Sequence, residues 1–398
     1  MAFDFDRLID RRTTNSLKWK RYGPRVLPLW VADMDFAAPP AVLEALQRAV
    51  AHGIFGYDVP SQSLREAVAA RMEKLYGWQV APAAVVATPG IVAAFAAAAR
   101  GLCAAGQGIL VQPPVYPPFL GVHESAGLVR QMAPLKRVEQ DGILHYYIDW
   151  DVFESALDDG ARTAMFLLCS PHNPTGQVFS REELLRIAEI CLERDILICS
   201  DEIHSELLLG DARHVPIAAL SPEIAARTIT LVAPSKTFNV PGLFCGFAII
   251  PDQALRKRYK EMLEQMALHV NSLGLLAAQA AFSGACDDWL VGLRAYLTAN
   301  RDFLVAFARA EFAGISLTVP EATYLAWLDC CESVGAGGIQ GTPQQFFLKN
   351  ARVALSEGQD FGPGGEGCVR LNFGCPRSTL EEALRRMKAA MDASTAAQ

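Results

Sequence analysis

The stretch TLVAPSKTF, residues 230–238, is the segment around which the rest of the chain is arranged. An apolar, β-branched run ends in Ser235, Lys236 and Thr237, which predicts a buried strand that delivers a lysine at its carboxyl end. Partial burial lowers the pKa of a lysine and frees its lone pair. Lys236 is therefore a candidate for a Schiff base with a carbonyl compound. The alternative is a solvated lysine after a strand.

The chain around this stretch alternates between apolar runs and helical periods. The runs cover residues 85–87, 109–112, 164–169, 196–199, 229–232 and 247–250. Residues 180–194 form the clearest helix, since Ser180 and Glu183 make a capping box before an apolar face. Continuous apolar strands that alternate with helices indicate an α/β fold, with a largely parallel sheet covered on both faces.

The remaining segments predict a second, smaller α+β domain. Residues 1–45 look irregular, and a helix with a capping box of Ser63 and Glu66 precedes Gly77. Residues 252–312 read as helices, three weak strands follow, and a final helix starts at Ser378. We expect a large domain over residues 46–284 and a small domain made of residues 1–45 and 285–398.

Composition excludes several classes of protein. The chain has 398 residues, of which 51% are hydrophobic and 20% charged, so a sizeable core is available. The net charge of -7 and the lack of a dense basic stripe argue against nucleic acid as a partner. No apolar segment is long enough for a membrane span, and residues 1–6 do not resemble a signal peptide. The ten cysteines lack zinc-ligand spacing, so we expect no metal and a reduced, cytoplasmic protein.

Five further residues follow predicted strands, at the edge where α/β sheets bind ligands. Gly90 and Ile91 open an alanine-rich helix, whose first amides favour an anion. Tyr116 lies in a proline-stiffened loop and is suited to packing on a flat ring, and the Asn173 amide can donate to a phenolate or carboxylate. Asp201 ends a buried strand and needs a cationic partner. Each has an ordinary structural alternative as a turn or packing residue.

A late arginine completes the set. Arg370 lies within an apolar strand, where its planar fork suits a substrate carboxylate, and the alternative is an internal salt bridge. In chain order, the residues provide a phosphate cradle, a ring stack, a phenolate donor, a pyridinium partner, a Schiff-base lysine and a carboxylate clamp. This order points to pyridoxal 5'-phosphate.

Other residues that attract attention receive structural interpretations. Asp33 and Asp35 could form a paired-carboxylate site, but we expect turn and cap carboxylates. His172 is expected to be a loop residue and Glu202 a structural one. The run Gly-Pro-Gly-Gly-Glu-Gly at 362–367 matches a dinucleotide fingerprint only formally, because it precedes a strand instead of joining a strand to a helix.

The sequence resembles the fold-type I pyridoxal-phosphate enzymes, the aspartate aminotransferase superfamily, from about residue 27 to residue 377. Within this superfamily, the sequence motifs are most similar to those of the cystathionine β-lyases and cysteine-S-conjugate β-lyases of the MalY/PatB type. This resemblance is carried by LPLWVADMDF at 27–36, HGIFGY at 52–57, PVYPPF at 114–119, SPHNPTG at 170–176, SDEIHSE at 200–206 and APSKTFN at 233–239.

The resemblance implies a role for each candidate. Lys236 would carry the cofactor covalently, Asp201 would face the pyridine nitrogen, and Tyr116 would stack on the ring; these three are the expected catalytic residues. Asn173 would contact the ring oxygen and, with Arg370, the substrate carboxylate. Further cofactor contacts would come from Gly90, Ile91, His204, Ser235 and, across a homodimer interface, Tyr57.

Two departures from the aminotransferase pattern bear on the reaction. Phe244 stands where many such enzymes have a phosphate-binding arginine, and Ala233 replaces a frequent serine. His204 replaces a tyrosine that commonly touches the ring oxygen. The resemblance therefore implies a C–S β-lyase that acts on L-cystathionine or related cysteine S-conjugates. The alternatives are an aminotransferase and a regulatory protein that binds pyridoxal phosphate and acts through a protein partner.

Overall fold

The computed structural model describes residues 3–157, 159–335 and 339–396 of the protein. Its centre is a seven-stranded sheet in the order β2-β10-β9-β8-β7-β3-β4. The strands are β2 Val85–Thr88, β3 Gly108–Val111, β4 Val129–Met132, β7 Thr163–Cys169, β8 Leu197–Asp201, β9 Thr228–Val232 and β10 Gly246–Ile249. Strands β4, β3, β7, β8 and β9 run parallel, whereas β10 is antiparallel to both of its neighbours. Each predicted apolar run lies on a strand, so the predicted sheet is confirmed.

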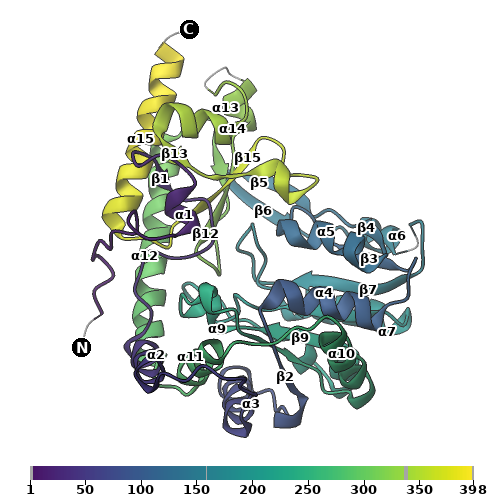
Figure 1. The fold of residues 1–398 in the computed structure, drawn as a ribbon. Coiled ribbons are helices and arrows are strands. Elements are labelled where there is room, and N and C mark those ends of the chain that lie inside the picture. Colours follow the sequence, from purple (N-terminus) through teal and green to yellow (C-terminus); the bar gives the residue numbers. More distant parts are fainter. Residues whose placement is uncertain (1–2, 158, 336–338, 397–398) are drawn as a thin grey trace.

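Helices cover both faces of this sheet (Figure 1). Met165 and Leu167 of β7 pack in one hydrophobic cluster with α4 (Ile91–Leu102) and α10 (Gln253–Gln265). Phe166 and Leu168, which point the other way, pack in a second cluster with α6 (Trp150–Ala156) and α7 (Arg181–Glu193). The remaining helices of this part are α2 Pro40–His52, α3 Gln62–Tyr76, α5 Pro117–Ala126, α8 Pro222–Ala226, α9 Pro234–Thr237 and α11 Ser272–Phe282.

A second sheet has the order β14-β15-β12-β11-β6-β5. Its strands are β5 Lys136–Gln140, β6 Ile143–Tyr147, β11 Ser316–Leu317, β12 Leu325–Asp329, β14 Ser356–Glu357 and β15 Cys368–Asn372. The hairpin β5–β6 precedes β7 in the chain, but it joins this sheet because β6 pairs with β11. This hairpin was not predicted, because β5 is exposed along its whole length and carries no apolar pattern. The division into domains stays a prediction.

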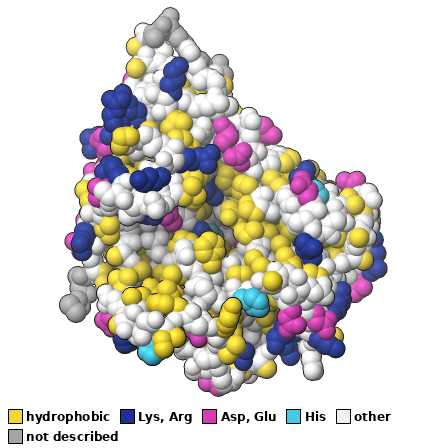
Figure 2. Space-filling model, viewed as in Figure 1, with side chains coloured by type: hydrophobic (Ala, Val, Ile, Leu, Met, Phe, Trp, Pro, Cys, Tyr) yellow, Lys and Arg dark blue, Asp and Glu magenta, His cyan; other side chains and the backbone are white. Residues whose placement is uncertain are grey.

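Helices around the second sheet complete this part of the molecule. They are α1 Leu17–Lys20, α12 Asp287–Glu311, α13 Cys331–Gly335, α14 Pro343–Phe346 and α15 Arg377–Ala396. The space-filling view shows a hollow between the parts of the molecule that carry the two sheets (Figure 2). No helix in the described part of the chain is long and apolar enough to cross a bilayer.

Two predicted helix starts need correction, and one helix was not predicted. The cap of α3 is Ser61, whose side chain accepts from the Leu64 amide, and Ser63 lies inside the first turn. The chain leaves the extended conformation at the first of two serines that could cap it. The final helix begins at Arg377, one residue before its predicted start, and α2 begins within the segment predicted to be irregular, because a proline is well tolerated in the first helical turn. The predicted capping box of Ser180 and Glu183 is confirmed.

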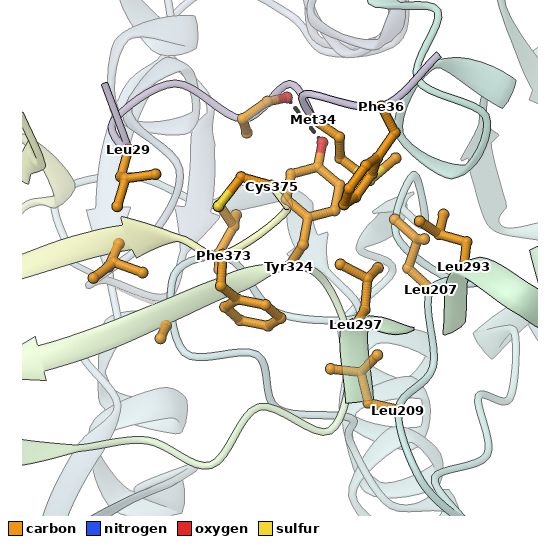
Figure 3. Packing of buried hydrophobic residues seen from close by; sticks show 14 of the residues in the cluster. Leu29, Met34, Phe36, Leu207, Leu209, Leu293, Leu297, Tyr324, Phe373 and Cys375 are labelled. Carbon is orange, nitrogen blue, oxygen red and sulfur yellow. Dashed lines mark hydrogen bonds between the residues drawn. The ribbon is translucent and has the colours of Figure 1, made fainter. Parts of the chain in front are cut away.

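The segment from residue 27 to residue 36 ties the two sheets together. Its start forms strand β1 (Leu27–Pro28), which pairs with β13 (Val353–Ala354), and Leu29, Met34 and Phe36 are buried in the largest hydrophobic cluster (Figure 3). The hydroxyl of Tyr324 donates to the Ala32 carbonyl at 2.9 Å. This segment therefore forms part of the space between the sheets, where the candidate site lies.

Candidate active site

A cavity of about 550 Å³ lies at the carboxyl ends of β8 and β9 and at the start of α4. Apolar and polar side chains of both parts of the molecule line it. All but one of the predicted site residues contribute to its wall: Gly90, Ile91, Tyr116, Asn173, Asp201, His204, Ser235, Lys236 and Arg370. These residues span 280 positions of the chain from Gly90 to Arg370, so their meeting in one cavity is a result of the fold.

Lys236 lies in the short helix α9, directly after the buried strand β9. Its Nζ donates a hydrogen bond to the Ala32 carbonyl oxygen at 2.6 Å. Burial is the largest influence on this amine and, with the positive charge of Arg370, lowers the pKa of Lys236 to about 8, while Asp33 and Asp201 act in the opposite direction. At pH 7 about a tenth of this amine is therefore unprotonated, far more than for a solvated lysine, and the unprotonated form is the one that acts as a nucleophile or base.

Asp201 ends strand β8 with its side chain in the cavity wall, and the residue is 4% exposed. Its Oδ1 accepts from the Ile203 amide at 3.1 Å, but the carboxylate has no ion pair with another described residue. Burial raises the pKa of Asp201 to about 7. A buried carboxylate without a cation is costly, so this position fits a ligand that brings a positive charge.

Glu202, the next residue, behaves differently. Its carboxylate accepts from the Ser200 hydroxyl at 3.0 Å and lies 2.8 Å from Nε2 of His214. The predicted structural role of Glu202 agrees with these contacts, because its oxygens are already bound within the protein.

Gly90 and Ile91 form the entrance to helix α4. Gly90 is the N-cap residue, and its φ of 104° is accessible to glycine but strained for other residues. Residues 89–93 line the cavity, so the amino end of a 12-residue helix borders it. The first amides of a helix have no acceptor within the helix, and they carry the positive end of its dipole. This edge of the cavity is suited to an anionic group.

Arg370 lies in strand β15 and is 5% exposed. It donates from Nη1 to Asn173 Oδ1 and from Nη2 to the Trp30 carbonyl oxygen, each at 2.9 Å. It makes no salt bridge with a described carboxylate, and its Nε is buried without a hydrogen-bond partner. Burial lowers the pKa of Arg370 to about 10, so the guanidinium remains charged at neutral pH. The alternative of an internal salt bridge is therefore wrong for the described part of the chain.

His204 and Tyr116 occupy other parts of the wall. His204 is 2% exposed, its Nδ1 has no partner among the described residues, and its ring meets the edge of Tyr324 at 6.0 Å. Burial, followed by the charges of Lys236 and Arg370, lowers the pKa of His204 well below its usual range, so its imidazole is neutral. Burial also raises the pKa of Tyr116, which keeps its hydroxyl protonated.

The residues that received structural interpretations do not line the cavity. His172 is buried beside Thr175, 2.9 Å from its hydroxyl, and does not line the cavity. Asp33 and Asp35 do not act mainly as turn or cap carboxylates, because cations bind them. Arg11 contacts both of them, and the buried ammonium of Lys18 lies 2.8 Å from Asp35.

Tyr57 is the predicted site residue that the cavity does not include. Its side chain is 108% exposed, and its neighbours Ile54, Phe55 and Val59 are exposed as well. On the face drawn in Figure 2, hydrophobic side chains gather over α2 and α11.

The sequence analysis missed several residues that complete the site. The carbonyl groups of Trp30 and Ala32 accept hydrogen bonds from Arg370 and Lys236. A backbone carbonyl carries no signal in a sequence, and residues 30 and 32 reach the cavity only through the path of the N-terminal segment.

The fold and the site define a class of α/β protein in which a desolvated lysine, a buried carboxylate without an ion pair among the described residues, and the amino end of a helix border one cavity. Residues 24–387 match the model of the family described as aminotransferase class I and II, and the chain belongs to this family. The cystathionine β-lyase PatB of Bacillus subtilis is 41% identical, over 98% of this chain and 100% of that protein.

Two further relatives have comparable coverage. Protein MalY of Escherichia coli is 31% identical over 96% of each chain. The solved structure of the PLP-bound C-S lyase from Staphylococcus hominis has a TM-score of 0.90 and 31% identity, and covers 98% of each chain. The predicted fold and the resemblance to this family are thereby confirmed.

Proposed function

We propose that this protein is a pyridoxal-phosphate-dependent C–S β-lyase that cleaves L-cystathionine or related cysteine S-conjugates to a thiol, pyruvate and ammonia. The observation that carries the proposal is the pairing, in one cavity, of the desolvated amine of Lys236 with the unpaired buried carboxylate of Asp201. The names of the relatives favour the lyase reaction.

The side chains in the cavity fit the proposed cofactor group by group. Lys236 would bind the aldehyde carbon of the cofactor. Asp201 would face the pyridine nitrogen, and the positive charge of that nitrogen would give this carboxylate a cationic partner. The remaining contacts would come from Tyr116 at the ring face, Asn173 and His204 near the ring oxygen, and Gly90, Ile91 and Ser235 at the phosphate. When bound, pyridoxal phosphate supplies an electron sink for a carbanion at the substrate α-carbon.

The residues of this chain then bind the substrate and move its proton. Arg370 would hold the substrate carboxylate through its planar fork, and Asn173 and the Trp30 carbonyl fix the orientation of that fork. The neutral amine of Lys236 would take the α-proton, a step that general bases accelerate by roughly 100 to 10,000-fold. Asp201 would keep the ring nitrogen protonated, and the apolar wall around Ile91 and Phe244 would limit the access of water.

Elimination and transamination share these steps and separate afterwards. Elimination needs a β-substituent that departs readily, and thiolates do so because their conjugate acids have a pKa of about 8.5. A preference of roughly 100-fold between the branches requires only about 2.7 kcal/mol of differential transition-state stabilisation. The reaction branch therefore has to be measured directly.

The decisive experiment gives the purified holoenzyme L-cystathionine and follows pyruvate without a keto acid. We expect steady release of pyruvate and of free thiol. A parallel assay supplies alanine or an aromatic amino acid together with a keto acid. If exchange of the amino group outruns pyruvate release for every sulfur substrate, the protein is an aminotransferase; if neither reaction occurs, the regulatory role replaces both.

We further propose that the active unit is a homodimer in the cytoplasm. The fully exposed Tyr57 and its exposed apolar neighbours Ile54, Phe55 and Val59 support an interface with a second copy of the chain, through which Tyr57 would reach the partner's cofactor phosphate. All ten cysteines are free, which agrees with a reducing compartment.

A further inference from the structure

A second cavity of about 410 Å³ adjoins the first one. Val31, Tyr116 and Arg370 line both cavities, so the two spaces meet at the arginine that is proposed to hold the substrate carboxylate. The buried Nε of Arg370 has no hydrogen-bond partner in the described structure. A ligand bound at Arg370 can therefore extend from the first cavity into the second.

The walls of the second cavity come from two distant parts of the chain. One wall contains Arg21, Tyr22 and Trp30 of the N-terminal segment. The opposite wall contains Glu357 and the 3-10 helix Gly358–Phe361. The glycine-rich loop that follows, residues 362–367, is the run that only formally matches a dinucleotide fingerprint.

The glycine-rich loop holds one wall of the second cavity in place. Gly362, with a φ of 86°, lies against Leu120 and Pro113, and the Phe361 carbonyl accepts from the Val115 amide at 2.9 Å. The loop thus fixes the wall that carries Asp360 against the proline-rich loop of Tyr116.

Three charged side chains of this cavity make no ion pair within the described part of the chain. The guanidinium of Arg21 packs over the rings of Trp30 at 4.9 Å and Tyr22 at 5.9 Å, but it makes no ion pair with a described carboxylate. Glu357 and Asp360 likewise make no ion pair with a described cation; Glu357 accepts only from the Gly358 amide, at 3.0 Å. One wall therefore presents a positive charge, and the other presents two negative charges.

We propose that the second cavity binds the distal amino-acid end of a thioether substrate, a group that carries both an ammonium and a carboxylate. Arg21 contacts the distal carboxylate, and Asp360 and Glu357 contact the distal ammonium. The inference rests on the proposed lyase function and identifies its substrate class as thioethers with an amino acid at each end, such as L-cystathionine. Simple alkyl cysteine conjugates fill only the first cavity.

The three charged side chains are expected to affect KM and not kcat, because they lie away from the bond that breaks. Arg21, Asp360 and Glu357 line the second cavity and not the first, so they bind a part of the substrate that does not change during the reaction. Such uniform binding lowers KM and leaves kcat unchanged. Since two of these three side chains are near solvent, we expect each to contribute a modest factor of roughly 5 to 30.

The test compares L-cystathionine with S-ethyl-L-cysteine on the holoenzyme. In Arg21→Gln and in Asp360→Asn, we expect kcat/KM for L-cystathionine to fall roughly tenfold through KM, with kcat within about twofold of wild type. The values for S-ethyl-L-cysteine stay unchanged. The matched control is Arg25→Gln, an exposed arginine of the same segment that does not line the second cavity, and it leaves both substrates unaffected.

The outcomes separate this inference from the proposed function. Suppose that wild type cleaves both compounds. If kcat/KM of the variants then falls by the same factor for both substrates, or falls for neither, the second cavity does not bind the distal group. If wild type cleaves neither compound, the lyase function fails. Dissociation constants for the two compounds, from changes in cofactor absorbance, then still decide the inference: it stands if the variants weaken L-cystathionine selectively and falls if they do not.

Discussion

Arg370 donates a hydrogen bond to Asn173 across 2.9 Å, which joins a strand of the second sheet to the turn that follows β7 of the central sheet. The side-chain amide orients the guanidinium but does not neutralise it. A carboxylate at residue 173 would occupy the arginine with an internal ion pair. The neutral partner therefore keeps a buried positive charge available for an anion.

Arg370→Gln is expected to lower kcat/KM for L-cystathionine roughly 100-fold or more. Loss of one member of a buried, hydrogen-bonded charge pair typically costs about 2–5 kcal/mol. Steady-state pyruvate release measures the effect. S-ethyl-L-cysteinamide, which lacks the carboxylate, is the matched substrate, and wild type and variant are expected to turn it over similarly. An equal loss on the amide would show that Arg370 acts on the fold and not on the carboxylate.

Lys236 is expected to be the residue that binds the cofactor covalently. The purified protein would be yellow, and borohydride would fix the cofactor to the peptide that contains Lys236, as mass spectrometry of the digest reports. Lys18, which is buried but bound to Asp35, serves as an internal comparison and is expected to remain unlabelled. Labelling of any other lysine would remove Lys236 from its proposed role.

The rate of cofactor uptake by the apoprotein is expected to rise with pH around a midpoint near 8. The pKa of Lys236 is lowered to about 8, and only the neutral amine attacks the aldehyde, so the reactive fraction grows as the pH increases through this value. Because the charge of Arg370 contributes to the lowering, Arg370→Gln moves the midpoint to higher pH. Stopped-flow absorbance between about pH 6.5 and 9.5 measures both profiles. An unchanged midpoint in the variant would contradict this coupling.

Asp201→Asn is expected to stabilise the apoprotein at pH 8 and to abolish most cofactor binding. Burial raises the pKa of Asp201 to about 7 in the folded state, above its value in the unfolded chain. The folded state thus holds more protons between about pH 4 and pH 7, and the free energy of unfolding of wild type falls as the pH rises through this range. Thermal melts of the two apoproteins would differ at pH 8 and converge near pH 4. A lower melting temperature for the variant at pH 8 would refute the assignment of an uncompensated carboxylate.

Hybrid dimers test the proposed role of Tyr57. Tyr57→Ala and Lys236→Ala are each expected to be inactive or nearly so. Mixing them under conditions of subunit exchange would restore activity, because one of the two sites in a mixed dimer would carry neither change. Exchange is monitored independently by native mass spectrometry. Exchange without recovery of activity would mean that Tyr57 and Lys236 do not serve a shared site.

Most of the central sheet was accessible from the sequence for a simple reason. Strands such as β7 and β8 are buried on both faces, so they appear as uninterrupted apolar runs. The edge strand β5, with the sequence KRVEQ, is stabilised by pairing with β6 and by no burial of its own. Its existence depends on contacts with distant residues, which local sequence patterns do not encode.

The candidate site likewise contains residues that could be predicted from the sequence and residues that could not. Gly90, Asn173, Asp201 and Lys236 follow predicted strands, and the rule that ligands bind at the carboxyl ends of strands brings them together. The second cavity could not be predicted, because Arg21 and Asp360 line one cavity only through the packing of the N-terminal segment near the 3-10 helix after β14. No periodicity or spacing relates these two residues.

The path of residues 27–36 also has a consequence for the order in which the active site assembles during translation. The Ala32 carbonyl that accepts from Lys236 is synthesised well before the two residues that hold its neighbours in place. These are Arg370, which donates to the Trp30 carbonyl, and Asn372, which donates to the carbonyls of Val31 and Asp33. The early segment waits for partners that emerge more than 300 residues later. A nascent chain that has already exposed Lys236 therefore still lacks Arg370, the residue proposed to bind the substrate carboxylate.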